Sequence, residues 1–197
     1  MLNVSPKAVG SVPVSFGGYQ VFETAFGFCG AGWSEAGLAR FILPAPDAGS
    51  VERLLKRRFP DGNATQPTGA LANLAVAVRR YFDGVQQDFS RVPLDLSGIS
   101  PFHQTLYTAM RGLSYGETTT YGALCESVGF PKATRETGAA MGKNPIPLII
   151  PCHRVLAAGG KIGGFSAHGG ITTKQKMLAL ENARSPNADE AQGTFAF

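Results

Sequence analysis

The sequence predicts two domains: a small α/β domain over residues 19–97 and a mainly helical domain over residues 98–183 that contains a helix-turn-helix. β-Branched and aromatic residues punctuated by glycine indicate strands in the first part. Apolar residues at helical spacing dominate after a boundary near Ser97-Gly98. With 197 residues, 44% of them hydrophobic, the chain can bury a sizeable core.

Strands are expected early in the chain. Residues 1–18 are rich in Gly, Ser and Pro, so we expect a flexible segment. From Tyr19 to Leu43 the pattern predicts short strands in a meander. The later segment QDFSRVPLDL (87–96) is predicted to be an edge strand, because Pro93 has no N–H to donate to a sheet.

Two helices are expected between these strands. Residues 50–59, SVERLLKRRF, place apolar side chains on one face behind Ser50 as a candidate cap. Residues 70–82, ALANLAVAVRRYF, predict a second helix that ends near Asp83-Gly84. Strands and helices together predict an α/β domain whose topology stays open.

The second domain is predicted to be mostly helical. A helix over residues 100–113 opens with a serine cap and a proline in its first turn. Thr120 caps a helix through Val128, Gly129 ends it, and Pro131 starts another that runs to about residue 142. Two short helices joined by a tight glycine turn form a helix-turn-helix pattern, which is also a common packing unit.

Composition narrows the class of protein. No stretch approaches the ~20 apolar residues of a membrane span, and the amino terminus lacks the pattern of a secretory signal. We therefore expect a cytoplasmic protein with no membrane partner. Three widely spaced cysteines, Cys29, Cys125 and Cys152, argue against a disulfide framework and against a zinc site.

Positive charge is concentrated in the second half of the chain. Residues 98–181 carry eight Lys/Arg against four Asp/Glu, whereas residues 1–97 carry nine against eight. This excess suits a polyanionic partner such as nucleic acid, but ordinary domains often carry as much.

Cys152 is the first candidate for chemistry, in the string IIPCHRV. A neighbouring base or cation lowers the pKa of a thiol, and His153 and Arg154 are adjacent in sequence. Two prolines bracket the apolar run before it and stiffen the segment. A small buried packing residue is the alternative, and it stays open at this point.

Glu181 is a candidate third member of a catalytic triad. The last helix is expected over about 173–183, with Thr172 and Gln175 as a capping box and a disordered tail over 184–197. Lys174, Met177, Leu178 and Glu181 share one face of it, so Glu181 should point inward with its apolar neighbours. A buried carboxylate needs a partner, which His153 would supply. A solvent-exposed acid at a frayed helix end is the alternative.

The second helix of the helix-turn-helix has one basic face and small residues. Its glycines and alanines permit close approach to a surface such as a phosphate backbone. Glu136 lies among the basic positions. The residues of the basic face are Lys132, Arg135, Ala139 and Lys143.

The strings SYGETTTYGAL, PKATR, GKNPIPLIIPCHRV, GGKIGGFS and LALE occur in this order. They resemble the O6-alkylguanine-DNA alkyltransferase family, the methylated-DNA–protein-cysteine methyltransferases, densely from about Pro101 to Glu181. A looser similarity over FETAFGFCGAGWSEAGLARFILP implies a ribonuclease-H-like fold for the amino-terminal domain.

The resemblance implies a stoichiometric repair protein. Such a protein flips an alkylated guanine out of double-stranded DNA and moves the alkyl group from O6 onto its own cysteine, with O4 of thymine as an additional candidate. A thiolate is a soft nucleophile suited to attack at carbon, and the thioether formed is inert. The resemblance further implies a monomer that uses no cofactor and no metal.

Individual roles follow from the same resemblance. Cys152 is the acceptor, His153 its base through a water, and Glu181 orients His153. Arg135 enters the stack vacated by the base. Asn144 holds the turn around the site, and Tyr121 gives its hydroxyl to the flipped guanine or pushes a phosphate. The residues that face DNA are Lys132, Ala139 and Lys143. Those that line the pocket are Val155, Phe165 and Ser166.

The chain departs from the family pattern at several positions. Glu136 follows Arg135 where small apolar residues are usual, and Phe165 stands where tyrosine is common. The loop FSAHGG is two residues longer than usual, which bears on the alkyl groups that fit. Cys29 and Cys125 are expected to be packing residues.

Two other functions remain open. A damage-binding protein of the same family would flip the base without accepting its alkyl group, but such members typically lack the cysteine. A thiol hydrolase built on Cys152, His153 and Glu181 would leave the helix-turn-helix without a purpose.

Overall fold

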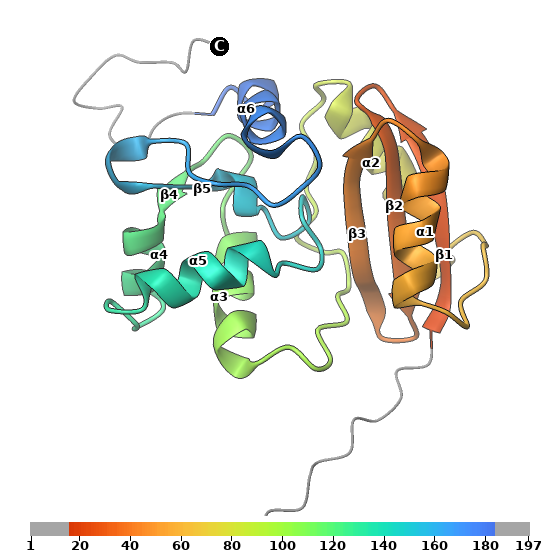
Figure 1. The fold of residues 1–197 in the computed structure, drawn as a ribbon, viewed down its shortest axis with the longest axis horizontal. Helices are drawn as coiled ribbons and strands as arrows, with labels where there is room; N and C mark the ends of the chain where they lie inside the picture. The colour runs from red at the N-terminus through yellow and green to blue at the C-terminus, as the bar shows by residue number, and fades with distance from the viewer. Residues whose placement is uncertain (1–15, 184–197) are drawn as a thin grey trace, which may run out of the picture.

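The computed structural model describes residues 16–183, in which a three-stranded sheet lies beside a group of helices (Figure 1). A long connection over residues 83–100, which contains no helix or strand, separates the elements of the first half from those of the second. The elements are β1 (Phe16–Thr24), β2 (Gly27–Ser34), β3 (Gly37–Ala45), α1 (Ala48–Arg58), the 3₁₀ turn η1 (Gly69–Leu71), α2 (Leu74–Phe82), α3 (Pro101–Arg111), β4 (Thr119–Thr120), α4 (Tyr121–Ser127), α5 (Thr134–Gly142), the 3₁₀ turn η2 (Cys152–Arg154), β5 (Val155–Leu156), the 3₁₀ turn η3 (Ala158–Gly160) and α6 (Gly170–Leu180).

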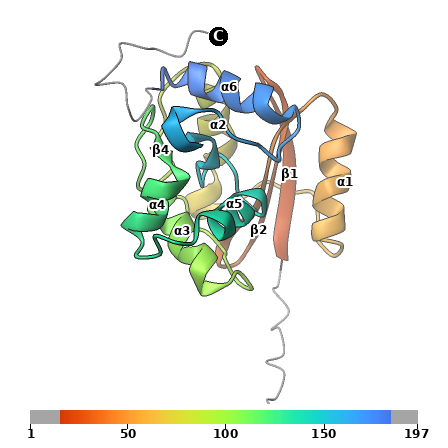
Figure 2. The same cartoon turned by 60° about the vertical axis from the view of Figure 1, so that its left-hand side comes forward.

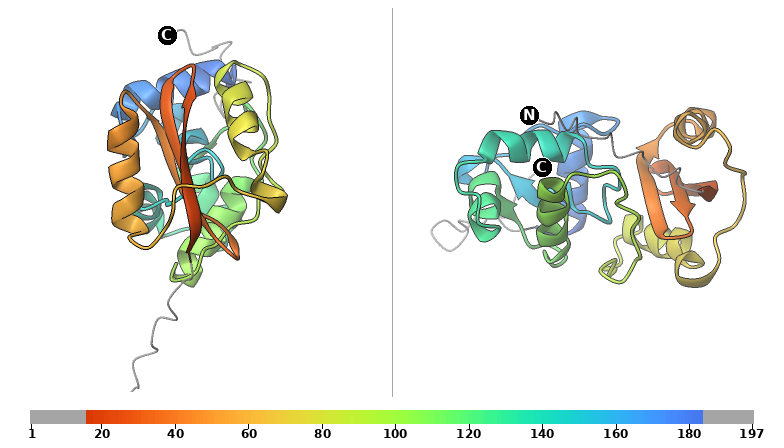
Figure 3. Two further views of the ribbon diagram at one scale, coloured as in Figure 1. Left: turned by 90° about the vertical axis from the view of Figure 1, so that its right-hand side faces the viewer. Right: turned by 90° about the horizontal axis from the view of Figure 1, so that it is seen from below.

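The three long strands form an antiparallel meander in the order β1-β2-β3, as the sequence predicted. α1 and α2 lie on opposite faces of this sheet, which is clearest from below (Figure 3). β1 begins at Phe16, so residues 16–18 of the segment expected to be flexible belong to a strand. Residues 1–15 and the tail 184–197 lie outside the described residues.

The predicted cap of α1 is wrong. Asp47, three residues before Ser50, is the cap: its carboxylate accepts the N–H groups of Gly49 at 3.1 Å and Ser50 at 2.7 Å. A carboxylate can satisfy two free N–H groups at a helix start, whereas a serine hydroxyl usually satisfies one.

The predicted edge strand over 87–96 is also wrong. This segment meets β3 at a single bridge, where the Leu38 N–H donates to the Pro93 carbonyl at 2.8 Å. Beyond it Asp95 accepts a hydrogen bond from the Ser34 hydroxyl at 2.5 Å and another from the Ser97 N–H at 2.9 Å. The Asp95 N–H also donates to the Leu38 carbonyl at 2.9 Å, so the segment contacts the sheet at one point and does not pair along β3.

Two helix starts in the second half differ from prediction. α5 begins at Thr134, because Pro131 and Lys132 form a turn in which the Ala133 N–H donates to Phe130. α6 begins at Gly170 behind a glycine in the left-handed conformation, so the predicted capping box is absent. The ranges of α3 and α4 and the Thr120 cap agree with prediction.

One apolar core joins the sheet to the helices. It includes Leu38 and Phe41 of β3 with Tyr107 and Met110 of α3. The Phe41 N–H donates to the Pro145 carbonyl at 2.9 Å, which ties β3 to the loop that precedes Cys152. Among residues 16–183 no helix combines the length and apolar character needed to cross a membrane.

Candidate active site

Cys152 opens the 3₁₀ turn η2 at the end of a rigid loop. Asn144 fixes this loop, because its amide nitrogen donates to the Ile150 carbonyl at 2.8 Å and its amide oxygen accepts the Ile146 N–H at 3.0 Å. Leu148 lies within the loop at φ 75°, a strained value for a residue with a side chain. Such strain persists only where the surroundings determine the backbone closely.

The Cys152 side chain is 7% exposed and borders two cavities. One, of about 300 Å³, is lined by Tyr121 and Gly138 as well as Cys152. The other, of about 390 Å³, runs from Cys152 to β3 and α1. Cys152 is therefore a mostly buried residue that borders both cavities, and both volumes fall within the range of small-molecule sites.

His153 and Glu181 form the pair that the sequence predicted. Nε2 of His153 lies 2.8 Å from Oε1 of Glu181, and both side chains are fully buried. Since an ionised carboxylate only accepts, Nε2 carries the proton. Nδ1 is then an acceptor, and it is buried without a hydrogen-bond partner among the described residues. A buried, unsatisfied ring nitrogen next to a cysteine is suited to accept its proton.

Glu181 receives hydrogen bonds from four residues. Oε1 accepts from the Tyr81 hydroxyl at 2.7 Å, His153 Nε2 at 2.8 Å and Arg154 Nη2 at 2.9 Å. Oε2 accepts from Arg154 Nε at 2.8 Å and the Gly116 N–H at 3.1 Å. Arg154 therefore faces the carboxylate rather than the thiol. Its adjacency to Cys152 in sequence had instead suggested a cation that lowers the pKa of the thiol.

These contacts determine the charges of the pair. Burial raises the pKa of Glu181, but His153 and Arg154 overcome this and hold the pKa well below its ordinary value. Burial lowers the pKa of His153, aided by the charges of Arg154 and Lys174, although Glu181 acts in the opposite direction. At neutral pH the site therefore holds an ionised Glu181 and a neutral His153.

Lys174 of α6 is a further charge near the thiol. Its side chain is fully buried and Nζ donates to the Val155 carbonyl at 2.6 Å. Burial lowers the pKa of Lys174 to about 8, while Cys152 acts in the opposite direction. Burial raises the pKa of the Cys152 thiol, and Asn144 and Lys174 partly offset this. A thiol of this kind needs a base to form a thiolate.

α4 and α5 present the predicted binding face. α5 crosses the outer side of the helical half with α3 and α4 beside it (Figure 2). The inward residues Thr137, Ala140 and Met141 are buried. The predicted DNA-facing residues are all exposed, namely Lys132, Arg135, Ala139 and Lys143.

The predicted pocket residues differ in placement. Phe165 and Ser166 line both cavities, and Tyr121, at the start of α4, lines the smaller one. Val155 is fully buried and lines neither cavity, and its carbonyl accepts from Lys174. Cys125 packs as predicted, with its sulfur 3.0 Å from the Thr137 hydroxyl, and Cys29 is buried in the core.

Sequence reasoning missed three residues of the site. Tyr81 reaches Glu181 from α2, one hundred positions away, and no local pattern signals this contact. Arg154 is adjacent to the thiol in sequence, and this adjacency does not indicate its contact with Glu181. Lys174 could have been found, because its position on the inward face of α6 predicted a buried cation that needs a partner.

Comparisons with known proteins agree with this geometry. Residues 101–183 match the family model described as 6-O-methylguanine DNA methyltransferase, DNA binding domain. A methylated-DNA–protein-cysteine methyltransferase of Mycobacterium tuberculosis is 41% identical over 136 residues, covering 68% of this chain and 80% of that relative. A DNA base-flipping protein of Thermus thermophilus is 40% identical over 134 residues, covering 68% of this chain and 87% of that relative.

A solved structure extends the likeness to the whole fold. The crystal structure of Mycobacterium tuberculosis OGT in complex with DNA has a TM-score of 0.66 and 31% identity, covering 83% of this chain and 91% of that one. The shared architecture is a mixed α/β fold with substantial helical content. On the identity and coverage of these relatives, the chain belongs to the methylated-DNA–protein-cysteine methyltransferase family.

Proposed function

We propose that this protein repairs DNA directly, by moving an alkyl group from O6 of guanine to Cys152 in a single, irreversible step. The observation that carries the proposal is the arrangement at η2: a cysteine that borders two cavities, followed by a neutral imidazole whose other nitrogen is held by a buried carboxylate. DNA is the partner that fits the family, and O4 of thymine is a second position to test.

The transfer balances with groups that the chain supplies. Nδ1 of His153 takes the proton of the Cys152 thiol through a water. The thiolate attacks the alkyl carbon, a C–S bond forms, and the bond from that carbon to O6 breaks with its electrons passing to guanine. The guanine anion takes a proton from the Tyr121 hydroxyl, which borders the smaller cavity, and the proton held by His153 returns through water to Tyr121, so that the net proton transfer is from the thiol to guanine. The product thioether does not hydrolyse, so each molecule acts once.

Two groups favour the thiolate once it forms. The Lys174 ammonium lies close enough to lower the pKa of the thiol, as does the Asn144 side chain. Charge near a developing anion in a water-poor site is the main way that proteins lower barriers of this kind. Asn144 also holds the loop, which is the role proposed for it from the sequence.

We propose that α4 and α5 act as a helix-turn-helix that docks on DNA with α5 in the minor groove. Gly138 and Gly142 support this, because a Cβ at either position would meet no atom within 4 Å outside its own helix. The protein's own packing therefore does not require glycine there. We take glycine there to serve the close approach of an external surface such as DNA. Both glycines border the smaller cavity at Cys152.

Arg135 is proposed to fill the stack when the damaged base leaves it. It is exposed on α5, one turn before the small residues. Unstacking requires a few kcal/mol, which an inserted side chain offsets in part. Glu136 is exposed beside it and would weaken, rather than abolish, contact with phosphates.

The amino-terminal half is proposed to be a separate domain of ribonuclease-H-like type, with a boundary near Ser97-Gly98. The antiparallel meander followed by α1 supports this reading. A location in the cytoplasm, a monomeric state and the lack of a cofactor or metal remain predictions from the sequence.

A non-catalytic base-flipping protein is the second candidate, and a relative of that name favours it. Cys152 and its base are present, so we rank it below repair. One experiment separates the candidates: incubate the protein with a duplex containing O6-methylguanine and measure the mass of the protein and its peptides. We expect one added methyl group on the Cys152 peptide, lost in Cys152→Ser. Binding without added mass would support the sensor, and turnover of an ester or amide would support a hydrolase.

A second experiment tests the role of Arg135. Arg135→Ala should slow repair of duplex DNA much more than reaction with free O6-benzylguanine, since only the duplex has a stack to open. Equal losses on both substrates would rule out the proposed role in flipping.

A further inference from the structure

The larger cavity at Cys152 extends well beyond the space that a methyl group needs. It has a volume of about 390 Å³, and its lining includes Cys152, Pro147 and Phe165 from the helical half together with residues of the edge strand β3 and Leu54 of α1. β3 is the edge of the sheet that faces the helical half (Figure 1). The cavity is therefore a groove that the helical half, which carries Cys152, and the amino-terminal half line together.

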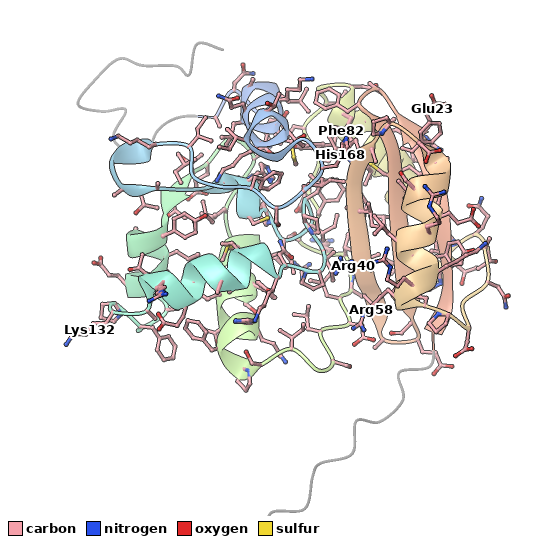
Figure 4. All side chains as sticks on the ribbon, viewed as in Figure 1. Glu23, Arg40, Arg58, Phe82, Lys132 and His168 are labelled. Atoms are coloured by element: carbon pink, nitrogen blue, oxygen red, sulfur yellow. The ribbon has the colours of Figure 1, made fainter. Side chains whose placement is uncertain are left out.

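Positive charge lines this groove and no carboxylate does. Arg40 of β3 and Lys143, directly after α5, contribute cations, and His168 of the loop before α6 contributes an imidazole. Figure 4 shows Arg40 and His168 in the region between the sheet and the helical half. None of the residues that line the groove is Asp or Glu.

Arg40 is a cation of this groove that has no anionic partner among residues 16–183. Its side chain is half-buried at the groove, and within residues 16–183 it makes no ion pair and no side-chain hydrogen bond. Arg58, rather than an acid, is the charged group that bears on it, and burial together with that charge lowers the pKa of Arg40. A partly buried guanidinium without a partner is available to an anion that enters the groove.

The middle of the groove is apolar. Ile42, Leu43 and Leu54 line it from the amino-terminal half, and Met141, Pro147 and Phe165 line it from the helical half. An occupant that suits both features has a hydrocarbon body next to the sulfur and an anionic group at its far end.

We infer that this groove is a subsite for large alkyl groups that end in a carboxylate, and that Arg40 is the residue that selects them. The inference rests on the proposed function and specifies its substrate. In the reaction the Cys152 sulfur bonds to the carbon attached to O6, the bond from that carbon to O6 breaks, and guanine leaves with a proton. The carboxylate takes no part in bond breaking and stays in the groove on the alkylated protein.

The test compares two free bases that differ only in charge. O6-(para-carboxybenzyl)guanine and O6-(para-carbamoylbenzyl)guanine have nearly the same shape, and neither carries a phosphate that could contact Arg40. The rate of alkylation of Cys152 is followed by intact-protein mass, and the ratio of the two rates is the readout. We expect the carboxylate to react about fivefold faster, the size of effect that a partly exposed ion pair supports.

Three variants make the ratio specific. Arg40→Met should bring the ratio close to one, while Arg40→Lys should keep most of it. Arg58→Met removes a neighbouring cation that does not line the groove and should leave the ratio as it is. A wild-type ratio near one, in a protein that still repairs an O6-methylguanine duplex, would overturn the inference and leave the proposed function standing.

Two further outcomes are informative. If Arg40→Met slows duplex repair but keeps the ratio, Arg40 contacts DNA phosphate and the subsite is wrong. If neither free base nor the methylated duplex modifies Cys152, the proposed function itself fails, and the subsite fails with it.

Discussion

The Tyr81 hydroxyl connects the amino-terminal half of the protein to the Glu181 carboxylate. It donates to Glu181 Oε1 at 2.7 Å from a fully buried ring on α2. Tyr81→Phe keeps the ring and removes one of the five hydrogen bonds that Glu181 accepts. A hydrogen bond to a charged group contributes about 1.5–3 kcal/mol. Because His153 and Arg154 still donate to Oε1, we expect a loss near the lower end, about 1.5 kcal/mol.

Two assays measure this loss. Thermal unfolding should shift down by about 3–6 °C, the change expected for 1.5 kcal/mol in a domain of this size. If all of the lost free energy reached the transition state, alkyl transfer would slow about tenfold. We expect a smaller decrease, since His153 keeps its own bond to Glu181.

Tyr19→Phe is the matched control. Its ring is also buried, but its hydroxyl donates at 3.1 Å to Glu52, a surface residue far from the site in sequence and fold. We expect a stability change below about 0.5 kcal/mol and an unchanged transfer rate. If Tyr81→Phe were as harmless as this control, the view that α2 supports the catalytic carboxylate would be refuted.

Three other predictions concern α5, acid and Lys174. Gly138→Ala should leave stability unchanged or raise it by up to about 1 kcal/mol, since a Cβ there has open space. It should nevertheless slow repair of duplex DNA more than reaction with free O6-benzylguanine. Equal rates for Gly138→Ala and the wild type on duplex DNA would contradict close approach. The free energy of unfolding in urea should fall from pH 7.5 to pH 5, because the lowered pKa of His153 gives a contribution that is complete above about 6.5 and is lost as pH falls. The lowered pKa of Glu181 acts in the same direction below about 4.5. A stability that rises from pH 7.5 to pH 5 would refute the assignment of His153, and one that rises as the pH falls below about 4.5 would refute that of Glu181. Lys174→Met should raise the apparent pKa of Cys152 in its reaction with iodoacetamide, and an unchanged pH profile would show that the ammonium does not act on the thiol.

Much of the active site could be predicted from local sequence. The PCHRV string marked Cys152 and His153 as candidates for a nucleophile and its base, and the three- and four-residue spacing in the last helix correctly turned Glu181 inward. The inward and outward faces of α5 also followed from spacing alone. These features are local, since the period of a helix determines which residues share a face.

Contacts between distant segments could not be predicted in this way. Tyr81 and Arg154 reach Glu181 only because α2, η2 and α6 pack together. The start of α6 was misplaced because Thr172 and Gln175 resemble a capping box, whereas the tertiary fold begins the helix earlier, at a left-handed glycine. The segment 87–96 has strand composition, but it meets β3 only at one bridge, and Asp95 bonds to Ser34 at the end of β2.

The central claim is that Cys152 is the final acceptor of the alkyl group and acts once. The most direct test uses excess duplex with an isotopically labelled O6-methyl group and counts the label per protein molecule and per peptide. The account predicts that the label saturates at one methyl per protein and lies entirely on the Cys152 peptide. More than one label per protein, label on the Cys29 or Cys125 peptide, or label released into solution would contradict it.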